Sequence, residues 1–157
     1  MFKIPSKVSV IISIILSIIF FVIIIGGAVI MPWLSDALID VSDNIGSRNE
    51  ITDAGRAFVL VLAYLILLFM AVADTMLFGL LVRVRNGKVF TEKSIALIRG
   101  ISWCAMLLFV AFGLLGKYFQ LSFFLAFACL FLGICLRVTK NVIEEAAQIK
   151  NENDFTI

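Results

Sequence analysis

Four long apolar runs limit the fold of this sequence more than any other feature. They cover about residues 8–31, 57–82, 95–116 and 121–136. A run of about 18 apolar residues is long enough for a helix to cross the roughly 30 Å hydrocarbon core of a bilayer. The composition, 62% hydrophobic and 15% charged, lies outside the range of soluble globular proteins. We therefore predict an all-α, four-helix transmembrane bundle forming one integral membrane domain, 1–157.

The first and last of these runs differ in length. The first is too long for the apolar core of a cleaved signal peptide, so we expect a retained span that ends at Pro32 and Trp33. Apolar residues at helical spacing in 34–41 indicate a short amphipathic helix after it. The fourth run is the shortest, and Arg137 is expected to snorkel from its end.

Lys and Arg residues predict the orientation, because they bias their loops to the cytoplasmic side. Of the 13 Lys and Arg residues, all but Arg48, Arg56 and Lys117 fall on one side of the four spans. Both termini are therefore predicted to be cytoplasmic. The loop 33–53 then lies outside and is acidic. It could be a docking surface for cations or cationic peptides, or it could be acidic only because translocated loops avoid Lys and Arg.

Small residues recur at intervals of three and four, which allows helix backbones to approach closely inside a membrane. Each such stripe predicts a packing face rather than a pore. The stripes are Ser9, Ser13 and Ser17 in the first run; Ala71, Thr75 and Gly79 in the second; and Ser122, Ala126, Cys129 and Gly133 in the fourth.

Asp74 is an ionisable residue within a span, where a charge costs about 2.5 to 3.5 kcal/mol on insertion scales. It lies about 12 Å above the inner end of its helix, at about 1.5 Å per residue. Arg99 enters the third span from that same side, so one prediction is an Asp74–Arg99 ion pair. The alternative is a carboxylate that carries protons or cations.

Residue types argue against several chemistries. The sequence has no His, which is the commonest general base and metal ligand. Cys104, Cys129 and Cys135 lie within predicted spans without metal-site spacing and are interpreted as packing residues. No phosphate loop or dinucleotide fingerprint is present. We expect neither enzymatic activity nor a cofactor nor a bound metal.

The predicted cytoplasmic segments carry local structural signals. Asn86-Gly87 is a turn signal, and Thr91 is a good N-cap for the third helix. The surrounding basic side chains suit anionic lipid headgroups better than nucleic acid. After the fourth span, apolar residues continue at helical spacing, which predicts a cytoplasmic amphipathic extension: Val138, Val142, Ala146 and Ile149. Its apolar stripe could rest on the protein's own loop, on lipid or on a partner.

Three segments together resemble a family of bacterial membrane proteins known as domain of unknown function 2975. They are Asn86-Gly-Lys-Val-Phe-Thr91, Ile98-Arg99 with Gly100-Ile-Ser-Trp103, and the tail from Glu144 to Ile157, in which Phe155 replaces an expected Leu. The resemblance implies a four-helix protein of the bacterial cytoplasmic membrane, without assigned activity. It also implies a neighbouring helix-turn-helix regulator, since such genes often lie together. It transfers no catalytic residue.

These observations favour a non-enzymatic membrane protein that holds, or signals to, a small cytoplasmic DNA-binding regulator. The alternative is a small transporter or channel subunit, or a protein that confers tolerance to membrane-active peptides. The lipid bilayer is an expected partner, a homo-oligomer is a further candidate, and direct nucleic-acid binding is not expected. The predicted partner surface comprises Gly87, Phe90, Thr91, Glu144, Glu145, Asp154, Phe155 and Ile157.

Overall fold

The computed structural model of the chain describes residues 6–44, 52–87 and 90–154, with the backbone alone at 6, 7, 42–44 and 151–154. It contains four α-helices: α1 (Ser6–Asn44), α2 (Asp53–Arg85), α3 (Glu92–Leu115) and α4 (Gln120–Asp154). All four are long and apolar enough to cross a membrane. The predicted all-α class with four spans is confirmed, and the chain is a multi-pass membrane protein.

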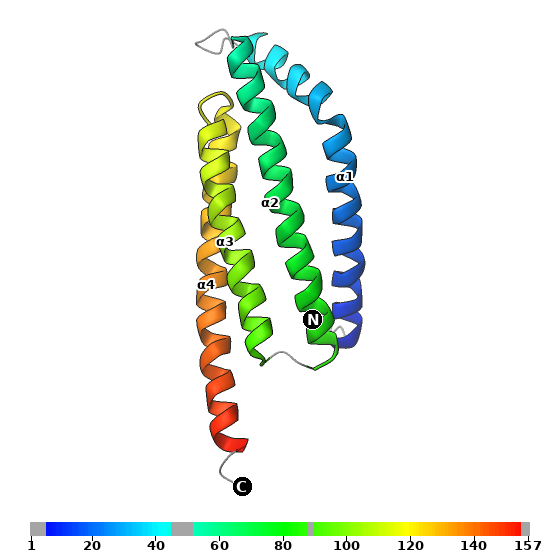
Figure 1. The fold of residues 1–157 in the computed structure, drawn as a ribbon, viewed down its shortest axis with the longest axis vertical. Coiled ribbons are helices and arrows are strands. Elements are labelled where there is room, and N and C mark those ends of the chain that lie inside the picture. Colours follow the sequence, from blue (N-terminus) through cyan, green and yellow to red (C-terminus); the bar gives the residue numbers. More distant parts are fainter. Residues whose placement is uncertain (1–5, 45–51, 88–89, 155–157) are drawn as a thin grey trace, which may run out of the picture.

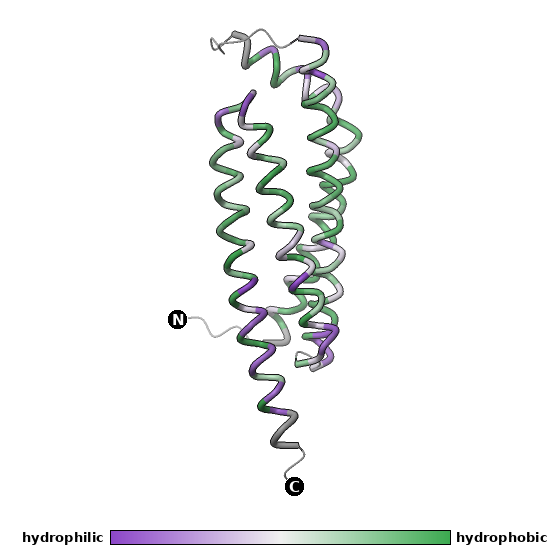
Figure 2. Tube along the Cα trace, turned by 60° about the vertical axis from the view of Figure 1, so that its left-hand side comes forward, coloured by the Kyte–Doolittle hydropathy of each residue, from purple (hydrophilic) through white to green (hydrophobic). Residues whose placement is uncertain are grey.

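The helices lie side by side in chain order, in an open bundle (Figure 1). Among the described residues, α1 approaches neither α3 nor α4 within 8 Å between Cα atoms, and α2 does not approach α4. Each helix therefore packs only on its sequence neighbours. Apolar residues dominate the middle of the helices and hydrophilic residues gather toward the ends (Figure 2). The exposed apolar faces of the edge helices are those expected to contact lipid.

One end of the bundle, here called the basic end, carries the α2–α3 connection, the start of α1 and the final turns of α4 (Figure 1). Arg83, Arg85 and Arg99 lie there, together with Arg137 and Lys140. The final turns of α4 extend beyond the α2–α3 connection along the axis of the helix (Figure 1). The predicted continuation of the fourth span as a helix is confirmed.

Residues 34–41 are helical, as predicted, but the expected break at Pro32 and Trp33 is wrong, because α1 continues through Pro32 to Asn44. The helix bends in this region, so that its last turns lean over the end of α2 (Figure 1). Proline has no N–H to donate to the carbonyl four residues earlier, that of Ala28. Tyr64 of α2 supplies the missing donor, since its hydroxyl donates to the Ala28 carbonyl oxygen at 3.1 Å. The Ala28 carbonyl, which loses its usual helical donor at Pro32, thereby accepts a hydrogen bond from the neighbouring helix.

The predicted outer loop 33–53 is therefore mostly helix where the structure describes it. Ile39 is fully buried, which anchors the turns after Pro32 on the protein. Arg56 of α2 lies 3.9 Å from Asp36 Oδ1 and 3.6 Å from Asp40 Oδ1. Two of the acidic side chains thus neutralise a cation of their own protein, whereas 45–51 lie outside the described residues.

The centre of the bundle is an apolar contact between α2 and α3, formed around Ile66, Leu108 and Ala111. Gly100 of α3 lies close to α2, since a Cβ built on it would come within 2.5 Å of Met76 Sδ. Between α3 and α4, the buried Ser102 hydroxyl donates to the Gly133 carbonyl oxygen at 3.0 Å. The predicted packing stripe of the fourth span is confirmed at Ser122, Ala126 and Gly133, which are buried.

We expect Gly100→Val to destabilise the bundle, because branched methyl groups would force Met76 away from the α2–α3 contact. Overpacking of this kind costs about 1–3 kcal/mol. Gly113→Val is the matched control on the same helix, since a Cβ there meets nothing within 4 Å. SDS-titrated unfolding in detergent micelles measures both free energies. Equal losses for the two variants would contradict the proposed close contact.

Candidate functional site

Asp74 is buried between α1 and α2, and the residue is only 5% exposed. The hydroxyl of Ser17, on α1, donates to Asp74 Oδ1 at 2.8 Å. Ser17 is itself buried, so the hydrogen bond lies in a region from which water is largely excluded. A polar group in such a place is costly without a partner, and Ser17 provides it.

The predicted Asp74–Arg99 ion pair is wrong for a geometric reason. Met76 faces α3 at Gly100, and a residue two positions away on a helix points about 200° around the axis. Asp74 therefore projects toward α1, although it lies near the height of Arg99. Arg99 Nη2 instead lies 3.7 Å from Glu144 Oε1 on α4.

A cavity of about 270 Å³ adjoins the Asp74–Ser17 hydrogen bond. Its other lining side chains come from α1 and α2, and most are apolar: Ile18, Phe21, Val22, Thr75 and Phe78. The Thr75 hydroxyl is directed to its own helix, donating to the Ala71 carbonyl oxygen at 2.8 Å. Asp74 is therefore the one ionisable residue in the lining of a mostly apolar cavity between α1 and α2.

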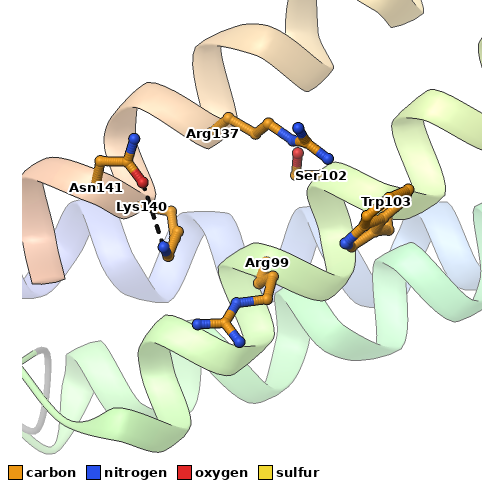
Figure 3. A pocket seen from close by; sticks show the side chains of 6 residues that line it. All are labelled: Arg99, Ser102, Trp103, Arg137, Lys140 and Asn141. Atoms are coloured by element: carbon orange, nitrogen blue, oxygen red, sulfur yellow. Dashed lines mark hydrogen bonds between the residues drawn. The ribbon is translucent and has the colours of Figure 1, made fainter.

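A second cavity, of about 260 Å³, lies between α3 and α4 near the basic end. We call it the basic pocket, and Figure 3 shows its lining side chains: Arg99, Ser102, Trp103, Arg137, Lys140 and Asn141. The residues from α4 recur at i, i+3 and i+4, so they share one face of that helix. Three of the six lining residues are cationic.

The positive charge of the basic pocket is only partly balanced. Glu144 accepts from Lys140 Nζ at 2.5 Å and lies near Arg99, as described above. Lys140 also donates to Asn141 Oδ1 at 3.2 Å (Figure 3). The Arg137 guanidinium lies over the Trp103 ring, 4.9 Å from its centroid. Among the described residues Arg137 has no carboxylate partner, so Glu144 balances two of the three cations and leaves the third without a counter-charge.

The structure divides the predicted partner surface. Gly87 adopts φ +71° after Asn86, as its turn requires, and Thr91 caps α3, with Oγ1 accepting from Ser94 N at 3.4 Å. Phe90 and Glu145 are exposed. Glu144 belongs to the basic pocket region instead, through Arg99 and Lys140. Of the chain end, Asp154 closes α4 with its backbone alone described, and Phe155 and Ile157 lie outside the described residues.

Sequence reasoning missed the basic pocket as a unit. Its signal was present, because the short connection between α3 and α4 makes these helices antiparallel neighbours. Residues at similar distances from that connection, such as Arg99 and Arg137, are then expected to lie at the same level. Of the three cysteines, Cys104 is buried as predicted, whereas Cys135 is exposed. Within the described part of the chain, no cluster of His, Cys, Asp or Glu could hold a metal.

Comparison with known proteins places the chain in a sequence family. A family model described as "Protein of unknown function (DUF2975)" matches residues 41–157. Neither a search of curated proteins nor a search of solved structures found a match. The resemblance expected from the loop and tail motifs is therefore confirmed.

Replacing Ser17 by Ala is expected to lower the free energy of unfolding by about 1–2 kcal/mol, because it removes the donor to the buried Asp74 carboxyl. Ser13→Ala is the matched control one turn earlier. Its hydroxyl donates only to the Ser9 carbonyl of the same helix, so we expect little change. SDS titration again provides the measurement, and a Ser13 effect as large as that of Ser17 would contradict the role assigned to this hydrogen bond.

Proposed function

The chain belongs to the family described as Protein of unknown function (DUF2975), and from that premise we propose a non-enzymatic regulatory role. In this proposal the α4 tail, residues 138–157, holds or signals to a small helix-turn-helix regulator in the cytoplasm of a bacterium. The basic end of the bundle faces the cytoplasm, as the distribution of Lys and Arg predicts.

The observation that carries the proposal is the exposed apolar stripe of the tail. Val138, Val142 and Ile149 are 58%, 59% and 57% exposed. A stripe that rested on the protein's own α2–α3 connection would be covered. A helix that binds a lipid surface lies in the plane of the membrane, whereas the tail continues along the axis of α4 (Figure 1). A protein partner therefore suits this stripe better than either alternative.

Charge also suits a DNA-binding partner. The tail carries four acidic residues, Glu144, Glu145, Glu152 and Asp154, against Lys140 and Lys150. DNA-binding domains present a basic surface to phosphates, so an acidic helix can occupy that surface. Complementary charge of this kind mainly sets the rate and specificity of association. Apolar contacts along the stripe would then supply much of the affinity.

The test is affinity purification from native membranes with an N-terminal tag, which leaves Ile157 free. We expect a helix-turn-helix protein to be recovered with the full chain and lost with Val142→Ser/Ile149→Ser. Both side chains are exposed, so their loss should leave the membrane bundle folded. Quantitative mass spectrometry of the eluates measures recovery, and a reporter for the regulator's target genes measures the consequence.

The matched control replaces a polar residue on the same stretch of helix, Gln148→Ser, which is expected to retain the regulator. A second variant ends the chain at Arg137 and removes the whole tail. If the truncated chain recovers the same regulator and leaves the reporter unchanged, the proposed role of the tail is wrong.

A second candidate function, transport, rests on the Asp74 carboxyl and its adjoining cavity. A transport carboxylate must be reached by water, so position 74 is tested as Asp74→Cys in a chain whose three native cysteines are replaced by Ser. Transport predicts labelling by a membrane-impermeant maleimide. Ala126→Cys is the buried control and Arg85→Cys the exposed one. Labelling no faster than at position 126 would indicate a sealed bundle.

A further inference from the structure

We propose that the basic pocket binds the phosphate group of an anionic phospholipid. The ligand class is a glycerophospholipid with a net negative headgroup, such as phosphatidylglycerol. The inference concerns the membrane side of the protein and does not depend on the proposed partner of the tail.

The positive charge of the basic pocket is not fully balanced by carboxylates. Arg99, Arg137 and Lys140 line one cavity, and among the described residues Glu144 forms ion pairs with Arg99 and Lys140. Arg137 donates to no carboxylate there and is held in place by the Trp103 ring. A guanidinium has several N–H donors in a rigid plane, which matches the oxygens of a phosphodiester. Basic pockets between transmembrane helices on the cytoplasmic side are typical sites for anionic headgroups.

The cavity volume fits a headgroup rather than a whole organic ligand. Pockets for drug-sized ligands enclose about 300–1,000 Å³, and this cavity encloses about 260 Å³. Ser102 and Asn141 add neutral polar groups to its wall. The headgroup would therefore enter the pocket while the rest of the lipid stayed outside.

The depth of the pocket matches the phosphate layer of a bilayer. The uncharged segments 100–115 of α3 and 121–136 of α4 are each about 24 Å long, at about 1.5 Å per residue. Both are somewhat shorter than the roughly 30 Å hydrocarbon core, so the cations that flank them at the basic end, Arg99 and Arg137, lie at its boundary. Trp103, an interfacial residue type that is 55% exposed, lies at the same level.

An apolar path for acyl chains begins at the pocket, and it favours a lipid over free phosphate. Trp103 is followed on α3 by exposed apolar residues at i+4, i+7 and i+11, namely Leu107, Val110 and Leu114. Residues at this spacing share one helix face. A lipid with its phosphate in the pocket would lay its chains along this face. A soluble phosphate would gain nothing from it.

Native mass spectrometry of the full chain in detergent, titrated with phosphatidylglycerol or phosphatidylcholine, measures the dissociation constant of the first bound lipid. We expect tighter binding of phosphatidylglycerol and a roughly tenfold loss of its affinity in Arg137→Gln/Lys140→Gln. The matched control, Arg83→Gln/Arg85→Gln, removes two positive charges from the same end but outside the pocket. It should change the affinity by less than about twofold.

Three outcomes would overturn the proposal. Equal losses in the two double variants would indicate attraction by diffuse surface charge. Equal affinity for the two lipids in the wild-type chain would exclude an anionic site. Displacement of phosphatidylglycerol by millimolar inorganic phosphate would identify a site for soluble anions.

Should the pocket variant fail to fold, the exposed Asn141 offers another substitution. Asn141→Asp adds a negative charge at the pocket and is expected to weaken phosphatidylglycerol binding. An unchanged affinity would contradict the proposed lipid site.

Discussion

The hydrocarbon core of a bilayer offers no hydrogen bonds, and the structure follows from the need to satisfy polar groups within the protein. Each helix satisfies its own backbone except where a residue interrupts the ladder. At Pro32 the interruption is repaired by Tyr64, and the one buried carboxyl, among the described side chains, is satisfied by Ser17. Both repairs join α1 to α2. Polar groups that would be costly alone thus become the links of a helical hairpin.

The second hairpin, α3–α4, is joined in the same manner by the Ser102–Gly133 hydrogen bond. Between α2 and α3 no side-chain hydrogen bond links described residues, and the contact there is apolar, around Ile66, Leu108 and Ala111. In lipid such a contact depends on close packing, because the surrounding acyl chains are as apolar as the side chains. The bundle can therefore be regarded as two hydrogen-bonded hairpins placed side by side.

Charge is distributed by the same constraint, toward both ends of the helices. At the end opposite the basic end, Arg56 is balanced by Asp36 and Asp40. At the basic end the cations of α3 and α4 outnumber their partner, Glu144. Glu144 also ties the first turns of the tail to α3, so the direction in which the tail leaves the bundle is set by the α3–α4 hairpin. The basic pocket and the tail share the turn of α4 that carries Lys140 and Asn141.

Much of the fold could be predicted from the sequence, because span number, span length and the position of basic loops depend on composition along the chain. The turn at Gly87, the cap at Thr91 and the helical tail depend on local backbone preferences and were likewise predictable. The sequence could not reveal that α1 passes through Pro32, because the compensating donor, Tyr64, lies on another helix. The missing N–H donor of a proline predicts a helix end only when no neighbouring side chain supplies another donor.

The sequence alone thus determined that four helices cross the membrane and which side chains are costly to bury, because these properties follow from residue type and order. Only the tertiary structure decided which costly groups meet. Asp74 and Arg99 lie at similar heights but face different neighbours, Ser17 and Glu144. The rotation of α3 and α4 about their own axes likewise brings Arg99, Arg137 and Lys140 to one cavity. Rotation about a helix axis is set by how whole faces pack against each other, and no single residue in the sequence carries that information.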